Sequence, residues 1–259
     1  MTGPIFIVGN GRSGTSVLLN TIRKTLDIPG HGEGHFHPLA FELMTSANRF
    51  FNKNERKAES ENHLLHYVEL KKIKREIRNI IAATYKEQYG TEYFIDKTPG
   101  PQGVQSVPFV QDAFPNTKVI FAHRRGIEVV RSAMKKFPHV EFEGHCKIWK
   151  NSMANWRTAR SQLHVPYLEI DQHDIANSPS LVSKRIGDLL ELDEEQVKTL
   201  ETYFTNDRPQ SSGDLNTGMV SLETSGWDEE QIRIFRRNCG AIMTEFGYSE
   251  GSDYRVSSE

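Results

Sequence analysis

The stretch Ile5-Phe6-Ile7-Val8-Gly9-Asn10-Gly11-Arg12-Ser13-Gly14-Thr15-Ser16 decides the fold of this 259-residue chain. Its first four residues form a short apolar run, glycines follow at once, and helical spacing of apolar residues begins at Val17. This order predicts a buried strand, a tight loop and a helix. Glycines let backbone N–H groups converge on an anion, and a helix start adds partial positive charge. The loop therefore predicts a phosphate cradle, formed by Gly11, Arg12, Ser13, Gly14, Thr15 and Ser16.

Three further apolar runs predict strands, and apolar residues at helical spacing separate them. The expected strands are Tyr93–Asp96, Val119–Ala122 and Tyr167–Ile170, and the expected helices include Trp149–Leu163, Leu181–Leu190, Glu194–Phe204 and Glu229–Phe246. Alternation of strands and helices favours an α/β fold, a P-loop-like three-layer sandwich with a mostly parallel central sheet flanked by helices. We expect one domain over residues 1–259, with a helical lid or acceptor-binding insertion at about residues 41–90.

Composition narrows the classes of partner and the cellular location. The formal net charge of −2 does not indicate a surface for nucleic acid. Cys146 and Cys239 lack the spacing of a zinc or redox site, so we expect two unpaired thiols. No signal peptide and no apolar stretch of about 20 residues is evident, which predicts a cytoplasmic protein without an integral membrane segment. A chain trimmed of a membrane anchor would have the same features.

Two familiar nucleotide-binding motifs do not fit the loop. A Walker A loop needs lysine before its final hydroxyl residue, and here Gly14 precedes Thr15 directly. Gly9, Gly11 and Gly14 have the spacing of a dinucleotide-binding turn, but no acidic ribose partner follows at the end of a second strand. A plain strand–helix turn remains the structural alternative.

The loop and two later segments resemble the PAPS-dependent sulfotransferase family, in its bacterial and protein-tyrosine branch. Arg-Ser-Gly-Thr at position 12 is similar to that family's 5′-phosphosulfate loop. Arg124 and Ser132, eight residues apart, match its 3′-phosphate ligands, although the residues between them, Arg125 to Ile127, depart from the pattern. The resemblance implies PAPS as donor, no required metal, and donor contacts from Arg12, Arg124 and Ser132. Lys136 either adds a positive charge at the 3′-phosphate or lies at a solvated helix end. The resemblance also implies that Ser211 and Ser212 contact the donor.

The same resemblance supplies candidates for the chemistry. Asp96-Lys97-Thr98-Pro99 is similar to a family motif whose lysine stabilises the transition state, together with Arg12, and we expect Pro99 to stop the strand and turn Lys97 into the cleft. Glu33 lies at the family's separation from Arg12 and is the implied base. A carboxylate can serve as the base if burial raises its pKa towards neutrality.

Histidines around Glu33 leave two alternatives open. His35 and His37 compete for the role of base, because imidazole titrates near neutral pH. His31, Glu33, His35 and His37 alternate along the chain, so an extended segment would place all four on one face, as in a metal site. Glycine and proline around them do not favour such a strand, and we expect no metal.

The acceptor is expected to carry a hydroxyl group, and carbohydrate, lipid, small molecule and peptide tyrosine all remain open. The basic run Lys71-Lys72-Ile73-Lys74-Arg75 suits an acidic or glycan acceptor, or forms a solvated helix face. The alternatives to a sulfotransferase are a P-loop-type kinase or phosphotransferase and a non-catalytic nucleotide-binding protein.

Overall fold

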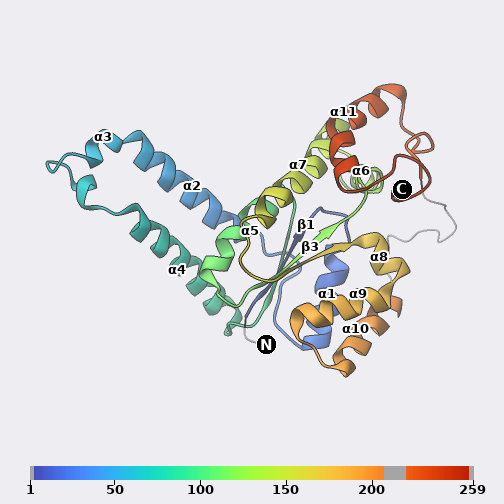
Figure 1. The fold of residues 1–259 in the computed structure, drawn as a ribbon, viewed down its shortest axis with the longest axis horizontal. Helices are drawn as coiled ribbons and strands as arrows, with labels where there is room; N and C mark the ends of the chain where they lie inside the picture. Colours follow the sequence, from blue (N-terminus) through green and yellow to red (C-terminus); the bar gives the residue numbers. More distant parts are fainter. Residues whose placement is uncertain (1–2, 207–219, 257–259) are drawn as a thin grey trace.

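A computed structural model describes residues 3–206 and 220–256 of the chain. Its centre is a parallel sheet in which the strand order is β2-β1-β3-β4 (Figure 1). The strands are β1 (Ile5–Gly9), β2 (Ile95–Pro99), β3 (Lys118–His123) and β4 (Tyr167–Asp171). The predicted parallel sheet is confirmed, and β2 extends three residues beyond the stretch expected from the sequence.

Side chains of the central strands alternate between two cores. Ile5 and Ile7 pack on one face of the sheet, whereas Phe6 and Val8 pack on the other, and all four are fully buried. The first face is covered by α1 (Thr15–Leu26), α8 (Gln172–Asn177), α9 (Pro179–Leu190) and α10 (Glu194–Asn206). The second face is covered by α5 (Pro101–Ala113), α6 (Gly126–Lys136), α7 (Phe142–Arg160) and α11 (Glu229–Glu245). The predicted three-layer α/β architecture is thus confirmed.

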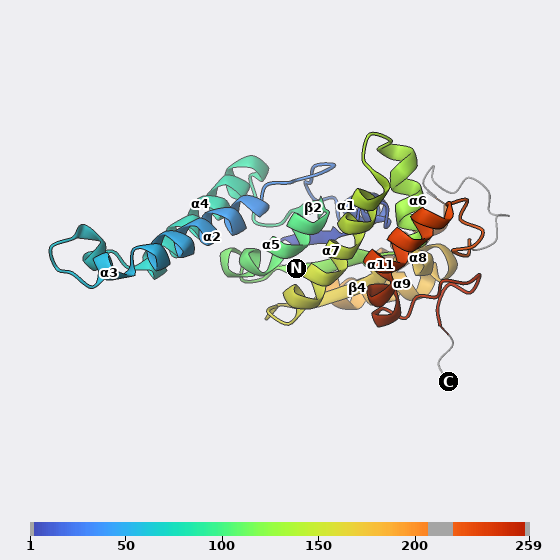
Figure 2. The ribbon, with the colours of Figure 1, turned by 90° about the horizontal axis from the view of Figure 1, so that it is seen from above.

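Residues 38–89 form a helical arm that projects from the body (Figures 1 and 2). The arm consists of α2 (Pro38–Lys53), α3 (Glu55–Ala58), a short 3₁₀ turn η1 (Leu64–Tyr67) and α4 (Leu70–Tyr89). Its buried side chains lie at the base, where Ala40, Ile81 and Tyr85 join the core on the second face. Between residues 45 and 80 no side chain is buried. Only the base of the arm is therefore close to the sheet.

Helices α5 and α8 were not predicted from the sequence, and α7 begins earlier than predicted. α5 is absent from the helices predicted above, where Pro99 marks only the end of the strand. Pro101 instead occupies the first turn of α5, where a missing N–H costs no hydrogen bond. α7 begins at Phe142 rather than Trp149.

Two further expectations concern membrane spans and thiols. Across the described ranges, no helix is both long and apolar enough to cross a bilayer. Cys146 and Cys239 are free and buried, and the thiol of Cys239 donates to the Cys146 carbonyl at 3.6 Å. They pack as core residues between α7 and α11.

Candidate active site

The loop after β1 has the conformation of an anion cradle. Gly9 has φ of 141°, and a Cβ there would lie 1.9 Å from the Ala122 carbonyl oxygen, so only glycine lets the loop leave the sheet so closely. Arg12 and Gly14 have φ of 70° and 79°, and these left-handed residues curl the backbone. Gly14 also caps α1, and it provides no capping side chain. The first N–H groups of α1 are therefore left for a ligand.

Ser13 also has a polar group in this loop that is left without a hydrogen-bond partner. Its side chain is fully buried, and its Oγ has no hydrogen-bond partner in the described part of the chain. A buried hydroxyl without a partner costs free energy, so such groups usually face a ligand or water. The position that a Cβ would take on Gly11 is open, which leaves room for a ligand against the backbone. The loop fits a phosphate or sulfate group.

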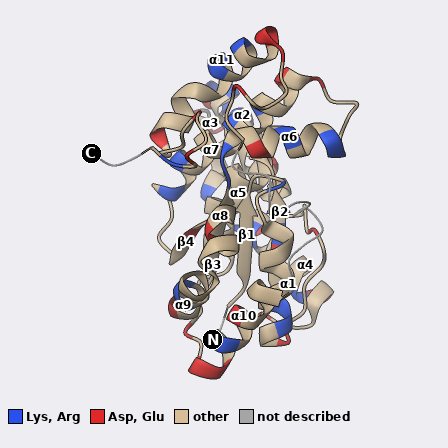
Figure 3. Cartoon of the chain, turned by 90° about the vertical axis from the view of Figure 1, so that its right-hand side faces the viewer, with Lys and Arg blue, Asp and Glu red and all other residues tan. Residues whose placement is uncertain are grey.

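A pocket of about 360 Å³ brings together the predicted donor ligands Arg12, Arg124, Ser132 and Lys136. Arg12 Nε donates to Ser132 Oγ at 2.9 Å, which joins the loop to α6. The remaining lining residues are Glu128, Arg131 and Lys135. The Lys and Arg residues of α6 are drawn in blue in Figure 3. Five cations against one carboxylate make this pocket suited to a multiply charged anion.

Arg131 and Lys135 were missed in the sequence, although a signal was present. Positions 128, 131, 132, 135 and 136 follow the spacing that places residues on one face of a helix. Projecting α6 from Ser132 would therefore have found both cations.

Lys97 lies within β2 and connects the loop to Glu33. Its side chain is 4% exposed, and its Nζ donates to Ser16 Oγ at 3.0 Å and to Glu33 Oε1 at 3.1 Å. β2 ends at Pro99, as predicted, and it is long enough to include Lys97, which therefore lies inside the strand rather than in a turn after it. Pairing with β1 along residues 95–99 holds Lys97 in place.

The loop that carries Glu33 is fixed on β2 by its backbone. The N–H of Gly34 donates to the Lys97 carbonyl at 2.9 Å, and the N–H of His35 donates to Thr98 Oγ1 at 3.0 Å. A Cβ on Gly34 would lie 1.8 Å from Asp96 Oδ2, so only glycine permits this approach. These contacts place Glu33 beside Lys97 across 64 positions of sequence.

The environment of Glu33 gives its carboxylate a lowered pKa. Partial burial acts to raise the pKa, but hydrogen bonds from His35 at 2.6 Å and from Lys97 together outweigh it. A pKa raised towards neutrality, the condition considered from the sequence, is therefore not what the structure shows. Glu33 is ionised at neutral pH, and it accepts from two neighbours.

The histidines do not form the alternating face required for a metal site. His35 has φ of 51°, which breaks the extended conformation. His37 is fully buried, its Nδ1 lies 2.8 Å from Ser106 Oγ, and burial lowers its pKa to about 4. Within residues 3–206 and 220–256, no group of three or more His, Cys, Asp or Glu side chains is placed to hold a metal ion.

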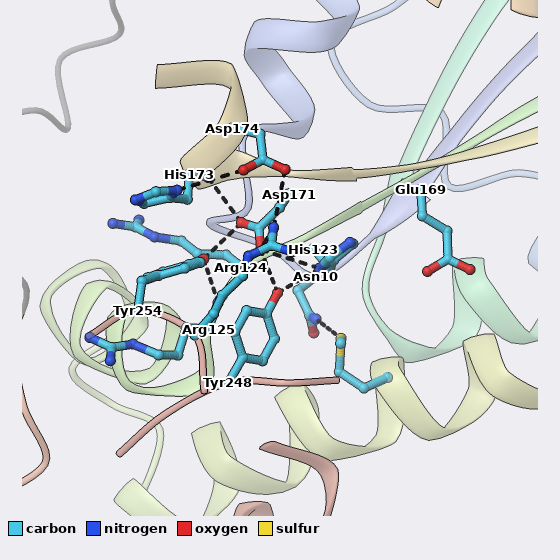
Figure 4. A network of polar contacts seen from close by, with 12 residues as sticks. Asn10, His123, Arg124, Arg125, Glu169, Asp171, His173, Asp174, Tyr248 and Tyr254 are labelled. Atoms are coloured by element: carbon cyan, nitrogen blue, oxygen red, sulfur yellow. Dashed lines mark hydrogen bonds and ion pairs between the residues drawn. The ribbon is translucent and has the colours of Figure 1, made fainter. Parts of the chain in front are cut away.

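The C-terminal segment, residues 246–256 after α11, is attached to the ends of β3 and β4 by a buried polar network (Figure 4). Asp171 accepts hydrogen bonds from the hydroxyls of Tyr248 at 2.9 Å and Tyr254 at 2.7 Å. Tyr248 also lies 2.5 Å from His123 Nδ1. Ser211 and Ser212, the remaining predicted donor contacts, lie outside the described residues.

Arg125, which departs from the family pattern, also binds this segment through its side chain. Its side chain is fully buried and pairs with Glu128. It donates to the backbone carbonyls of Val220, Ser249, Gly251 and Asp253 at 2.7 to 3.2 Å. Arg125 thereby holds the C-terminal segment next to Arg124, a role with no signal in the local sequence because its partners are more than 90 positions away.

Replacing Arg125 by methionine is expected to lower the free energy of unfolding by about 3 kcal/mol, because it leaves Glu128 and four carbonyls without their partner. Urea unfolding at neutral pH measures the change. Arg236→Met is the control: Arg236 pairs with Glu250 on the surface, and such a pair contributes about 1 kcal/mol or less. Equal losses in the two variants would contradict the anchoring role.

The fold and this cluster define an α/β protein with a glycine-rich loop after its first strand, and the geometry of that loop fits an anion. Comparison with protein families then gives a match to the sulfotransferase family over residues 4–196, and the chain belongs to that family. Sulfotransferase STF9 from Mycobacterium avium has a similar structure, with a TM-score of 0.56 and 13% identity over 96% of this chain and 78% of that one. The sulfotransferase domain of the Synechococcus PCC 7002 olefin synthase gives 0.48 and 20%, over 83% and 82% of the two chains. Among curated proteins, a sequence comparison found no match.

Proposed function

We propose that this protein transfers a sulfonate group from PAPS to the hydroxyl group of an acceptor. The observation that carries the proposal is the position of Lys97 Nζ, which contacts Ser16 of the anion cradle on one side and Glu33 on the other. A cation and an ionised carboxylate at the edge of an anion-binding loop are what a group transfer to a hydroxyl requires. A protein that only binds a nucleotide has no use for this pair.

The described residues fit the two charged ends of PAPS. In the proposal, the 5′-phosphosulfate lies on the loop, where Arg12, the N–H groups at the start of α1 and the unpartnered hydroxyl of Ser13 would hold it. The 3′-phosphate lies in the basic pocket, with Arg124, Ser132 and Lys136. Arg12 contacts Ser132 directly, so the two anion sites adjoin.

Each residue near Lys97 has a separate task in the proposed reaction. When bound, PAPS supplies the sulfonate: the bond from sulfur to the 5′-phosphate oxygen breaks as the bond from sulfur to the acceptor oxygen forms, and PAP leaves with the electron pair. Lys97 and Arg12 stabilise negative charge on the transferring and leaving oxygens. Glu33 accepts the proton of the acceptor hydroxyl. His35, hydrogen-bonded to Glu33, orients the carboxylate.

Ligand-induced stabilisation tests the donor. PAP is expected to raise the melting temperature, and ATP with Mg²⁺ is not, because binding to the folded state stabilises by mass action. Arg124→Met should weaken PAP affinity at least about tenfold, since hydrogen bonds to charged groups are worth about 1.5–3 kcal/mol. Arg49→Met, an exposed substitution in α2, is the control. Stabilisation by ATP and Mg²⁺ without any response to PAP would indicate a phosphotransferase instead.

A further inference from the structure

A second pocket, of about 300 Å³, opens beside Glu33 at the base of the arm. It lies between the loop that carries Glu33 and the last turns of α4. Glu33 forms part of its wall, so a molecule held there can present a group directly to the carboxylate. Its volume is at the lower end of small-molecule sites, which are about 300–1,000 Å³.

Aromatic rings form the wall of this pocket. The rings of Tyr85 and Tyr89 each stack on the buried ring of Phe94, with centroids 5.0 Å and 4.6 Å apart and planes within 17°. Phe36 packs edge-on against Tyr85 at 5.4 Å. Tyr85 is buried, so the partly exposed rings of Phe36 and Tyr89 are the ones that another ring can contact, and they are already fixed before binding.

Charge around the pocket is negative. Glu33 and Asp96 are its acidic side chains, and no lysine or arginine of the described residues lines it. Asp96 is satisfied internally by the hydroxyls of Tyr85 at 2.9 Å and Thr98 at 2.8 Å. An anionic acceptor would thus meet like charge, and Lys97, the cation beside Glu33, is already paired with that carboxylate.

The basic run Lys71–Arg75 of the arm does not make the pocket suitable for an anion. Lys71 to Arg75 lie in the first turns of α4, whereas the pocket begins at Thr84. Thr84 lies nine positions after Arg75 along the helix, which is about 13.5 Å along the axis. The run is too distant to neutralise an anion in the pocket, and an acidic or glycan acceptor loses its main support.

We infer that this pocket holds the acceptor, and that the acceptor is an uncharged compound whose hydroxyl group is carried on or next to an aromatic ring. The inference rests on the proposed function. The ring would pack against Phe36 and Tyr89, and the hydroxyl would reach Glu33, which takes its proton as the oxygen bonds to sulfur. The arm then acts as the acceptor wall through its base, and its tip takes no part.

Calorimetric binding with and without saturating PAP tests this inference. 4-Ethylphenol should bind at least about tenfold more tightly than anionic 4-hydroxyphenylacetate or non-aromatic 4-ethylcyclohexanol. Turnover of 4-ethylphenol and of N-acetyltyrosine amide with labelled PAPS then separates a free phenol from a peptide tyrosine as the source of the ring. Equal affinity for the three compounds would overturn the inference.

A variant that fills the pocket supplies the matched comparison. Thr84→Phe should weaken 4-ethylphenol binding at least about tenfold, because the new ring takes up the space at the rim. Thr202→Phe in α10 is the control, since both threonines are exposed and donate to the carbonyl four residues earlier at 2.9 Å. Unchanged binding in Thr84→Phe would refute the pocket assignment. If PAP does not bind the wild-type protein, the proposed function is wrong. Binding of 4-ethylphenol measured without PAP still tests whether this pocket holds an aromatic hydroxyl compound.

Discussion

Replacement of Lys97 by methionine is expected to lower kcat by about a hundred- to a thousandfold, the usual loss when one preorganised donor to a transition state is removed. Lys97 is held in the middle of a buried parallel strand, so its ammonium group needs no rearrangement before reaction. Methionine keeps the length of the side chain and leaves no buried charge behind. PAP affinity should fall by less than about tenfold, because Arg12, Arg124 and Ser132 remain. Single-turnover rates with labelled PAPS measure the loss.

Lys118→Met is the matched control for this variant. Both lysines lie on strands of the sheet, and each Nζ is 3.1 Å from a glutamate carboxylate, Glu33 for Lys97 and Glu191 for Lys118. Lys118 is the first residue of β3 and pairs in register with Ile5, at the end of the strands opposite the Gly9–Ser16 loop, so its loss should leave kcat unchanged. A Lys97→Met protein that melts like the control and keeps kcat within about threefold would show that Lys97 does not stabilise the transition state.

Local sequence was enough to predict the sheet and the glycine-rich loop after its first strand. Runs such as Ile5–Val8 are apolar without alternation because helices cover both faces, and the glycines mark where the backbone must turn. The secondary-structure prediction failed where one residue type is compatible with two different elements. Pro101 can stop a strand or begin a helix, and only packing against the sheet selects the helix α5.

The site was less predictable, because its geometry depends on distant contacts. Glu33 meets Lys97 only because Gly34 and His35 bond to β2, and no local pattern encodes that attachment. The lowered pKa of Glu33 follows from the same contacts and could not be inferred from the residue type. Arg125 is similar: its role as an anchor depends on carbonyls of a segment folded back from the other end of the chain.

Replacement of Glu33 by glutamine is expected to lower kcat by about a hundredfold or more, up to about 10⁴, with PAP affinity nearly unchanged. Glutamine keeps the shape of the side chain and an oxygen that can still accept from Lys97, but it cannot take a proton. The lowered pKa of Glu33 sets the pH dependence of the wild-type enzyme. The carboxylate is the reactive form above that pKa, so kcat should be flat near neutral pH and fall only in acid, below the ordinary glutamate value of 4.5.

His35 supplies the comparison that separates the two candidate bases. Its ring lies 2.6 Å from Glu33 Oε2 and is about half exposed, so His35→Asn should fold normally. If Glu33 is the base, His35→Asn loses less than about tenfold in kcat, because only the orientation of the carboxylate is affected. If His35 is the base, the order of the losses reverses, and His35→Asn loses more than Glu33→Gln. Steady-state rates of the three proteins from about pH 4 to about pH 8 therefore show which of the two side chains accepts the proton of the acceptor hydroxyl.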